Sequence, residues 1–395
     1  MKAVTWQGVH DMQVSDVPDP RIEEPTDVII KVTSTGLCGS DLHLYETLTP
    51  FMEAGDIVGH EPMGIVEEVG ASVSKLEVGD RVVVPFNICC GECWMCGRGL
   101  HSQCETTQNH EHGTGASFFG YSKLYGQVPG GQAEYLRVPF GDFMPVKVPQ
   151  QHPDDRFLFL SDVLPTAWQG LKYADLPDDG TLLVLGAGPI GDMASRMGRR
   201  EGHRVISVDN VPERLKRTEA FGAEVINLDE AEAGDGVAEI VRDLTDGRGA
   251  DAVIDAVGME AHGAPVASAV QKFAGMLPDA VSEPLMKKAG LDRLAALHTA
   301  IDAVRRGGTV SVLGVYGGAA DPMPMMQLFD KQVQLRMGQA NVRAWTDELL
   351  GMLVEDDPFG VDSFATHHVP LDEAPRAYRQ FQKKENGVVK VVFKP

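Results

Sequence analysis

Five of the six cysteines in this chain lie in one stretch, C-C-G-E-C-W-M-C-G-R-G-L-H-S-Q-C, which covers residues 89–104. Four of them follow a C-x2-C-x2-C-x7-C spacing: Cys90, Cys93, Cys96 and Cys104. Short gaps let a tight turn aim successive thiolates at one point, and four thiolates suit a closed, structural zinc site. An iron–sulfur cluster and a pair of disulfides are the alternatives. The remaining cysteine, Cys89, is interpreted as a packed free thiol.

The sixth cysteine, Cys38, lies far upstream in T-G-L-C-G-S-D-L-H, and G-H-E-P follows it with His60 and Glu61. A catalytic zinc needs three protein ligands and one open position. Asp162, in the apolar run L-S-D-V-L-P-T, is a candidate for the third ligand because a buried carboxylate needs a compensating cation. Taken singly, these residues also fit a buried thiol, a core histidine and a helix N-cap.

Residues 181–191 read T-L-L-V-L-G-A-G-P-I-G, an apolar run that leads into G-x-G-x-x-G. A helix-compatible segment and a second apolar run, ending at Asp209, come next. This order of strand, glycine turn, helix, strand and acid is typical of dinucleotide binding. An acid at this place favours NAD over NADP, whereas the nearby Arg214 could accept a 2′-phosphate. The turn residues assigned to the cofactor are Gly186, Gly188, Pro189, Ile190 and Gly191.

The elements around these motifs differ between two parts of the chain. From about residue 164, buried strand-like runs alternate with helical patterns, which predicts a doubly wound parallel sheet. The earlier residues show short strands separated by Gly and Pro, which indicates mainly antiparallel β structure. The C-terminal V-V-K-V-V-F-K-P is a strand that could return to this first part. Segments 106–131 and 263–292 exceed normal loop length and are interpreted as lids, oligomer contacts or surface decoration.

The chain of 395 residues carries a formal net charge of −22. This acidity should repel nucleic acid and anionic membranes, so we expect neither as a partner. The start, MKAVTWQGVHDMQV, lacks the apolar core of a signal peptide, and we expect a cytoplasmic protein.

At this point the motifs resemble the zinc-dependent alcohol dehydrogenases of the medium-chain dehydrogenase/reductase superfamily. Four signatures carry the resemblance in the right order: G-L-C-G-S-D-L-H, G-H-E, the four-cysteine segment and G-A-G-P-I-G. Two further segments, G-G-Q-A-E-Y-L-R-V-P and L-S-D-V-L-P-T, are most similar to the group that contains glutathione-independent formaldehyde dehydrogenase.

This resemblance implies an α/β fold with two domains. Residues 1–163 and 339–395 would form a GroES-like, mainly antiparallel catalytic domain with a structural zinc lobe at about 88–105. Residues 164–338 would form a Rossmann NAD-binding domain. It also implies two zinc ions per chain, an NAD cofactor and a homo-oligomer, either a dimer or a tetramer.

The resemblance also implies roles for single residues. Cys38, His60 and Asp162 would hold the catalytic zinc, and Glu61 would lie behind it. Ser40 and His43 match the proton relay of the family, Arg214 a basic residue near the adenosine ribose, and Lys390 a basic residue facing the pyrophosphate. Phe118, Phe119, Tyr121 and Trp168 are interpreted either as apolar substrate contacts or as ordinary packing.

Three functions follow from these expectations. The first is hydride transfer between NAD and an alcohol, primary or secondary, with formaldehyde hydrate included. The second is an aldehyde dismutase that keeps NAD(H) tightly bound. The third is a non-catalytic sensor or structural module that retains the zinc and NAD sites.

Overall fold

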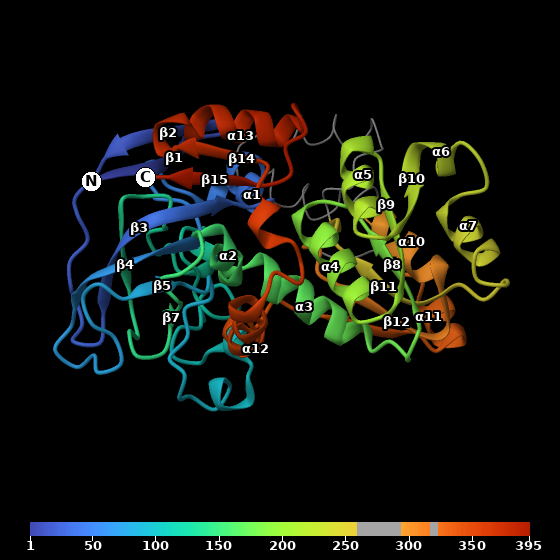
Figure 1. Ribbon diagram of the computed structural model, residues 1–395, viewed down its shortest axis with the longest axis horizontal. Helices are drawn as coiled ribbons and strands as arrows, with labels where there is room; N and C mark the ends of the chain where they lie inside the picture. The colour runs from blue at the N-terminus through green and yellow to red at the C-terminus, as the bar shows by residue number, and fades with distance from the viewer. Residues whose placement is uncertain (259–293, 317–322) are drawn as a thin grey trace. The chain divides into compact units, whose positions relative to one another are not determined.

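The computed structural model describes residues 1–258, 294–316 and 323–395 (Figure 1). The described residues form two compact units, Met1–Thr166 with Ala340–Pro395, and Ala167–Gln339. The sequence predicted boundaries after residues 163 and 338. The predicted inserted segment 263–292 lies outside the described residues. Among the residues that are described, no helix is both long and apolar enough to cross a membrane.

The first unit is built on a sheet with the strand order β14-β15-β3-β4-β5-β7, and β6 also pairs with β3. All its pairs are antiparallel except β14 with β15. A separate hairpin joins β1 to β2. The strands are β1 (Lys2–Gly8), β2 (Asp11–Asp16), β3 (Val28–Leu37), β4 (Glu61–Val69), β5 (Arg81–Val83), β6 (Tyr135–Val138), β7 (Val146–Lys147), β14 (His367–Pro370) and β15 (Val391–Lys394).

The C-terminal strand β15 lies directly beside β3, as Figure 1 shows in red and blue. The predicted return of the chain end to the first unit is therefore confirmed. Helix α13 precedes this strand and buries Ala374, Ala377, Tyr378 and Phe381, a spacing that places all four on one helical face. The helices wholly within this unit are α1 (Asp41–Glu46), α2 (Asp155–Leu158), α12 (Val342–Glu355) and α13 (Ala374–Lys383).

The second unit contains a parallel sheet with the order β10-β9-β8-β11-β12-β13. Numbered along the chain this is 3-2-1-4-5-6, the order of a dinucleotide-binding doubly wound sheet. Its strands are β8 (Thr181–Leu185), β9 (Arg204–Asp209), β10 (Glu224–Asn227), β11 (Ala250–Asp255), β12 (Val304–Val312) and β13 (Gln334–Met337). Its helices are α4 (Pro189–Arg200), α5 (Pro212–Ala220), α6 (Leu228–Glu232), α7 (Val237–Asp243), α10 (Ala295–Ala303) and α11 (Met325–Lys331). Helix α3 (Val163–Ala174) begins in the first unit and ends in the second.

Candidate active site

Four metal-binding side chains from three separate segments meet in the first unit. Cys38 follows β3, His60 directly precedes β4, Glu61 opens β4, and Asp162 directly precedes α3. One donor atom from each residue lies within 4.8 Å of the others. Because β3 and β4 are antiparallel neighbours, the end of one strand and the start of the next bring Cys38 and His60 together.

The contacts among these side chains centre on the carboxylate of Asp162. Its Oδ2 lies 3.4 Å from Cys38 Sγ and 3.5 Å from His60 Nε2. Its Oδ1 accepts a hydrogen bond of 2.8 Å from the hydroxyl of Thr166, one turn along α3. This second bond fixes the carboxylate, so that one oxygen remains directed at the thiol and the imidazole.

The donor atoms of the cluster and their electrostatics suit a cation. Removal from water, reinforced by Asp162, raises the pKa of the Cys38 thiol to about 11. Burial also raises the pKa of Glu61. Burial opposes protonation of His60, yet Asp41 and then Asp162 hold the pKa of its imidazole well above the usual value. Nearby carboxylates thus add to the shift of Cys38 and outweigh burial at His60, and this donor set of sulfur, nitrogen and oxygen fits zinc.

Lys390 lies inside this cluster, with no exposed surface. Its ammonium group donates to Leu37 O at 3.0 Å and to Glu61 Oε1 at 2.5 Å. The lysine therefore pairs with Glu61, and among the three proposed ligands an ionised Cys38 and Asp162 carry two negative charges, which suits a divalent ion. The predicted contact of Lys390 with the cofactor pyrophosphate stays a prediction.

The side chain of Glu61 requires a glycine opposite it on the neighbouring strand. Glu61 pairs with Gly36 across β3 and β4, and a Cβ on Gly36 would lie 2.2 Å from Glu61 Oε2. That oxygen is buried and has no hydrogen-bond partner among the described residues. Gly36 thus makes the space that the second carboxylate oxygen occupies, and this oxygen can still bind a metal ion.

The sequence analysis missed Asp41, which is fully buried beside His60. Its Oδ1 lies 3.2 Å from His60 Nδ1, and its Oδ2 accepts a hydrogen bond from the backbone N–H of Cys38 at 3.0 Å. A carboxylate at Nδ1 directs the other ring nitrogen, Nε2, toward a metal. The sequence carried one indication of this role: Asp41 lies three residues after Cys38, a spacing at which an aspartate side chain can accept a hydrogen bond from the backbone.

Ser40 and His43, the predicted relay residues, lie at the start of α1. Ser40 Oγ is 3.3 Å from His60 Nε2, and His43 is buried within the helix. The structure therefore brings Ser40 to the ligand cluster, and the relay itself stays a prediction.

Aromatic rings from segment 106–131 pack near the ligands. The ring of His60 lies 5.8 Å from Phe86 and 6.3 Å from Tyr121, and Phe118 packs at 5.0 Å against Phe86. Tyr125 stacks on Phe118 at 4.2 Å. Segment 106–131 thus contributes to the core of the first unit rather than only to its surface. Phe119 is fully buried in another cluster, and Trp168 is a buried residue of the second unit.

The four predicted lobe cysteines converge as well, with their sulfur atoms within 4.8 Å of one another. Burial raises the pKa of Cys104 to about 11. At Cys93 burial is overcome by the backbone N–H groups of Cys96 and Glu105, which lower the pKa of that thiol to about 6. Such amide-supported thiolates are the ligands of structural zinc sites. Cys89 is a buried free thiol that packs 3.5 Å from the sulfur of Met144.

In the second unit, the glycine turn joins β8 to α4. Gly186 has a φ of +86°, and a Cβ on Gly191 would lie 1.8 Å from the carbonyl oxygen of Gly186. Gly188 is the N-cap of α4, and Pro189, the first residue of the helix, has no backbone N–H. The backbone N–H groups at the start of the helix are therefore those of Ile190 and Gly191. An anionic phosphate is stabilised at such a helix N-terminus.

Asp209 ends β9 beside this turn. Its carboxylate accepts hydrogen bonds from Ala187 N at 2.7 Å and from Val211 N at 2.8 Å. Arg214 Nη1 lies 3.9 Å from the same carboxylate. Asp209 therefore ties the glycine turn to the end of β9, and each oxygen retains a lone pair for another donor.

A mixed β unit with a four-donor cluster and a doubly wound unit with a glycine turn together define a zinc-type medium-chain dehydrogenase. Residues 24–149 match the alcohol dehydrogenase GroES-like domain, and residues 189–277 match the zinc-binding dehydrogenase domain. The chain belongs to the zinc-type alcohol dehydrogenase family and is a zinc-dependent oxidoreductase that uses a nicotinamide cofactor and acts on small molecules.

Individual relatives support this assignment over the whole chain. It is 41% identical, over 100% of both chains, to the uncharacterized zinc-type alcohol dehydrogenase-like protein AdhB of Bacillus subtilis. It is 31% identical to the formaldehyde dismutase of Pseudomonas putida, over 97% of this chain and 95% of the relative. It is also 31% identical to the glutathione-independent formaldehyde dehydrogenase of Pseudomonas aeruginosa, over 96% of this chain and 94% of the relative. Among solved structures, alcohol dehydrogenase TADH from Thermus sp. ATN1 is 33% identical, with a TM-score of 0.82 and coverage of 100% of this chain and 99% of that chain. The predicted family and fold class are confirmed.

Proposed function

We propose that this enzyme transfers hydride between an alcohol and NAD, at a zinc held by Cys38, His60 and Asp162. The observation that carries the proposal is the convergence of these donors within 4.8 Å, with Lys390 paired to the neighbouring Glu61. Zinc at this place supplies Lewis acidity, which lowers the pKa of a bound hydroxyl. NAD supplies the hydride acceptor.

The residues of the chain then have distinct tasks. Ser40 Oγ, beside His60 Nε2, would accept the hydroxyl proton of the substrate while it passes its own proton on, and His43 would release a proton toward solvent. The rings of Phe86, Phe118 and Tyr121 give the ligand cluster an apolar neighbour. Such a neighbour favours a primary or secondary alcohol whose carbon part is apolar, and it limits the access of water.

The cofactor assignment rests on the second unit. The N-terminal amides of α4 would hold the phosphates of NAD, and Asp209 would accept from the ribose hydroxyls. A carboxylate at this position repels a 2′-phosphate, so NAD is favoured although Arg214 is close. The four-cysteine lobe holds the second zinc ion. We place the enzyme in the cytoplasm because clustered free cysteines of this kind serve as metal ligands in a reducing compartment.

The quaternary structure is part of the proposal. Met325, Met326 and Phe329 on α11 are between 64% and 80% exposed, and Met337 on the edge strand β13 is 57% exposed. A sheet edge with exposed apolar side chains is normally covered by another part of the protein or by a partner. We assign it to a second copy of the chain, and light scattering on wild type and Phe329→Asp tests this: the variant should have a lower mass.

A second candidate function is favoured by one observation, the similarity to a protein named formaldehyde dismutase. One experiment separates the two: absorbance at 340 nm after pure protein is mixed with added NAD and a panel of alcohols plus formaldehyde. A steady rise with an alcohol supports the dehydrogenase. A flat trace while formaldehyde is consumed supports a dismutase that retains its cofactor. No reaction with any compound would instead mean that the panel lacks the right substrate class.

A further inference from the structure

A chain of buried polar side chains leads from the C-terminal helix α13 to the imidazole of His60. It consists of Tyr378 on α13, Gln132 in the loop before β6, and Asp41 at the start of α1, and all three are completely buried. Tyr378 donates its hydroxyl proton to Gln132 Oε1 at 2.9 Å. Gln132 Nε2 donates to Asp41 Oδ2 at 3.3 Å and to Gly36 O at 3.2 Å.

The direction of each hydrogen bond in this chain follows from its neighbours. The carbonyl of Gly36 and the carboxylate of Asp41 can only accept, so the NH2 group of Gln132 must face them. Its oxygen then faces Tyr378, and the tyrosine hydroxyl must donate. Asp41 Oδ2 accepts from Gln132 Nε2 and from the N–H of Cys38. Its Oδ1 approaches His60 Nδ1 to 3.2 Å, an ion-pair contact whose geometry is not that of a hydrogen bond.

Backbone hydrogen bonds also connect the Gln132 segment to the residues just before His60. The N–H of Gln132 donates to Val58 O at 3.0 Å, and the N–H of Gly131 donates to Gly59 O at 2.8 Å. Gly59, directly before His60, has a φ of +97°, and a Cβ there would lie 2.3 Å from Gln132 Cγ. The glutamine therefore contacts both the backbone before His60 and the carboxylate beside its ring.

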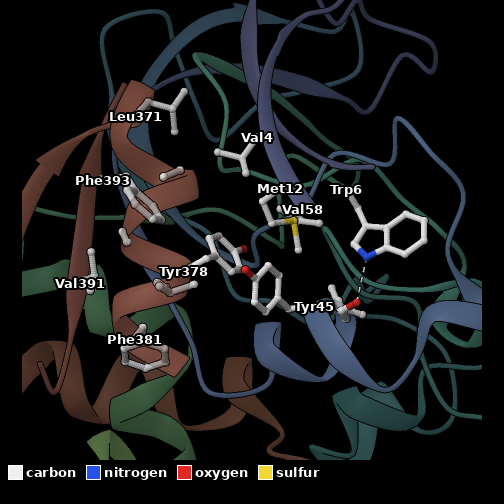
Figure 2. Close-up of a cluster of buried hydrophobic side chains, with 14 of the residues drawn as sticks. Val4, Trp6, Met12, Tyr45, Val58, Leu371, Tyr378, Phe381, Val391 and Phe393 are labelled. Atoms are coloured by element: carbon white, nitrogen blue, oxygen red, sulfur yellow. Dashed lines mark hydrogen bonds between the residues drawn. The ribbon is translucent and has the colours of Figure 1, made fainter. Parts of the chain in front are cut away.

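Tyr378 is itself held by packing rather than by local turns. It lies in the hydrophobic cluster between α13, the β1–β2 hairpin and α1, where Figure 2 shows it beside Tyr45. The centroids of the two rings are 5.7 Å apart. Phe381, one turn further along the apolar face of α13, is buried in the same cluster. The position of the Tyr378 hydroxyl is thus fixed by the close packing of the core around its ring.

We propose that Gln132 and Tyr378 are positioning residues for the metal ligand His60. They orient Asp41, which in turn presents His60 Nε2 to the zinc. This inference rests on the proposed function, in which His60 holds the catalytic zinc. Loss of an outer partner of a metal ligand typically weakens metal binding by about 10- to 100-fold.

The test is the rate of zinc release to excess chelator, followed with a colorimetric zinc indicator and therefore independent of activity. Wild type should release two zinc ions in two separate phases. Gln132→Met keeps a similar side-chain volume but removes the hydrogen bonds to Asp41 and Tyr378. It should accelerate one release phase by about 10-fold, the lower limit of the effect expected when an outer partner of a metal ligand is lost. Tyr378→Phe leaves the bond of Gln132 to Gly36 intact and should accelerate the same phase less. Tyr45→Phe removes a hydroxyl from the same cluster that makes no bond to Gln132, and it is the matched control.

A cobalt-substituted protein gives the second readout. The visible absorption bands of Co²⁺ at the fast-release site should shift in Gln132→Met and Tyr378→Phe but not in Tyr45→Phe, because only the first two change the geometry at His60. Release at the wild-type rate in both variants with unchanged cobalt bands would overturn the inference, as would equal acceleration of both phases. If Gln132→Met does not fold, Tyr378→Phe alone decides by the same two readouts. His60→Ala separates this inference from its premise: if that variant still holds two zinc ions, the proposed zinc site is wrong.

Discussion

Lys390 Nζ lies 2.5 Å from Glu61 Oε1, and neither side chain has any exposed surface. The lysine comes from the residues just before the last strand and the glutamate from the first residue of β4, more than 300 residues earlier. A buried ion pair contributes little net stability, but removal of one partner leaves an uncompensated buried charge.

Lys390→Met should therefore lower the free energy of unfolding by about 3–5 kcal/mol. Urea unfolding of the metal-loaded protein measures the effect. The control is Lys394→Met on β15, where the ammonium pairs with Asp154 at 3.6 Å and is 44% exposed. Its loss should cost less than about 1 kcal/mol. The double variant Lys390→Met with Glu61→Met should recover much of the stability, and a double variant as unstable as the single one would contradict this account.

Asp162→Asn should reduce the zinc content from two ions to one per chain and abolish alcohol oxidation. The amide keeps the shape and can still accept from Thr166, but it lacks the charge that balances the ion. Elemental analysis gives the metal content, and far-ultraviolet circular dichroism checks the fold. Asp155→Asn is the control, because that buried carboxylate pairs with His368 at 2.7 Å and lies outside the ligand cluster. Two retained zinc ions in Asp162→Asn would mean that another residue is the ligand.

His101 should make stability depend on pH between about 6.5 and 4. Burial, and then the charge of Arg343, lower the pKa of this imidazole to about 4 in the folded protein, against 6.5 as its ordinary value. Between these values the unfolded chain binds the additional proton, so stability is present above pH 6.5 and is lost as the pH falls toward 4.

His101→Leu removes this titration. The difference in unfolding free energy between wild type and variant should change with pH by at most about 1.4 kcal/mol per pH unit within that window. Above pH 7 the difference should be constant. A difference that stays constant from pH 7.5 to 4.5 would exclude a buried neutral His101.

Asp209→Ala should raise the ratio of kcat/KM for NADP to that for NAD, because the carboxylate that repels a 2′-phosphate is gone. The Michaelis constants for both cofactors should also rise, since Ala187 N and Val211 N lose their shared acceptor. Arg214→Ala should move the cofactor ratio in the opposite direction. Steady-state kinetics with both cofactors test the pair, and an unaltered ratio in Asp209→Ala would remove Asp209 from cofactor choice.

The local motifs were the parts of the molecule that could be predicted from sequence. The glycine turn from Gly186 to Gly191 and the four-cysteine lobe depend on short spacings, and the structure brings their residues together as expected. The alternation of strands and helices was sufficient for the parallel sheet, because each crossover element is contiguous in the chain.

The surroundings of His60 could not be predicted in the same way. Gln132 and Tyr378 lie about 70 and 320 residues after His60, and a single glutamine or tyrosine carries no spacing signal. The place of Lys390 depends on the register between β15 and β3, and on the face of the sheet toward which its side chain turns. Such facts arise only from tertiary packing.

The antiparallel pairing of β15 with β3 has a consequence for protein synthesis. On the ribosome, β3 and the ligands Cys38, His60 and Asp162 emerge long before Tyr378, Lys390 and β15, because all of residues 167–339 are translated in between. At usual elongation rates of about 5–20 residues per second, the 228 residues from Asp162 to Lys390 take roughly 11–46 s. During that time one side of β3 lacks its final partner, and Glu61 lacks its counter-charge. The nascent chain therefore has to hold an unfinished metal site, and any zinc that it captures early is bound without the lysine and the tyrosine that complete its surroundings.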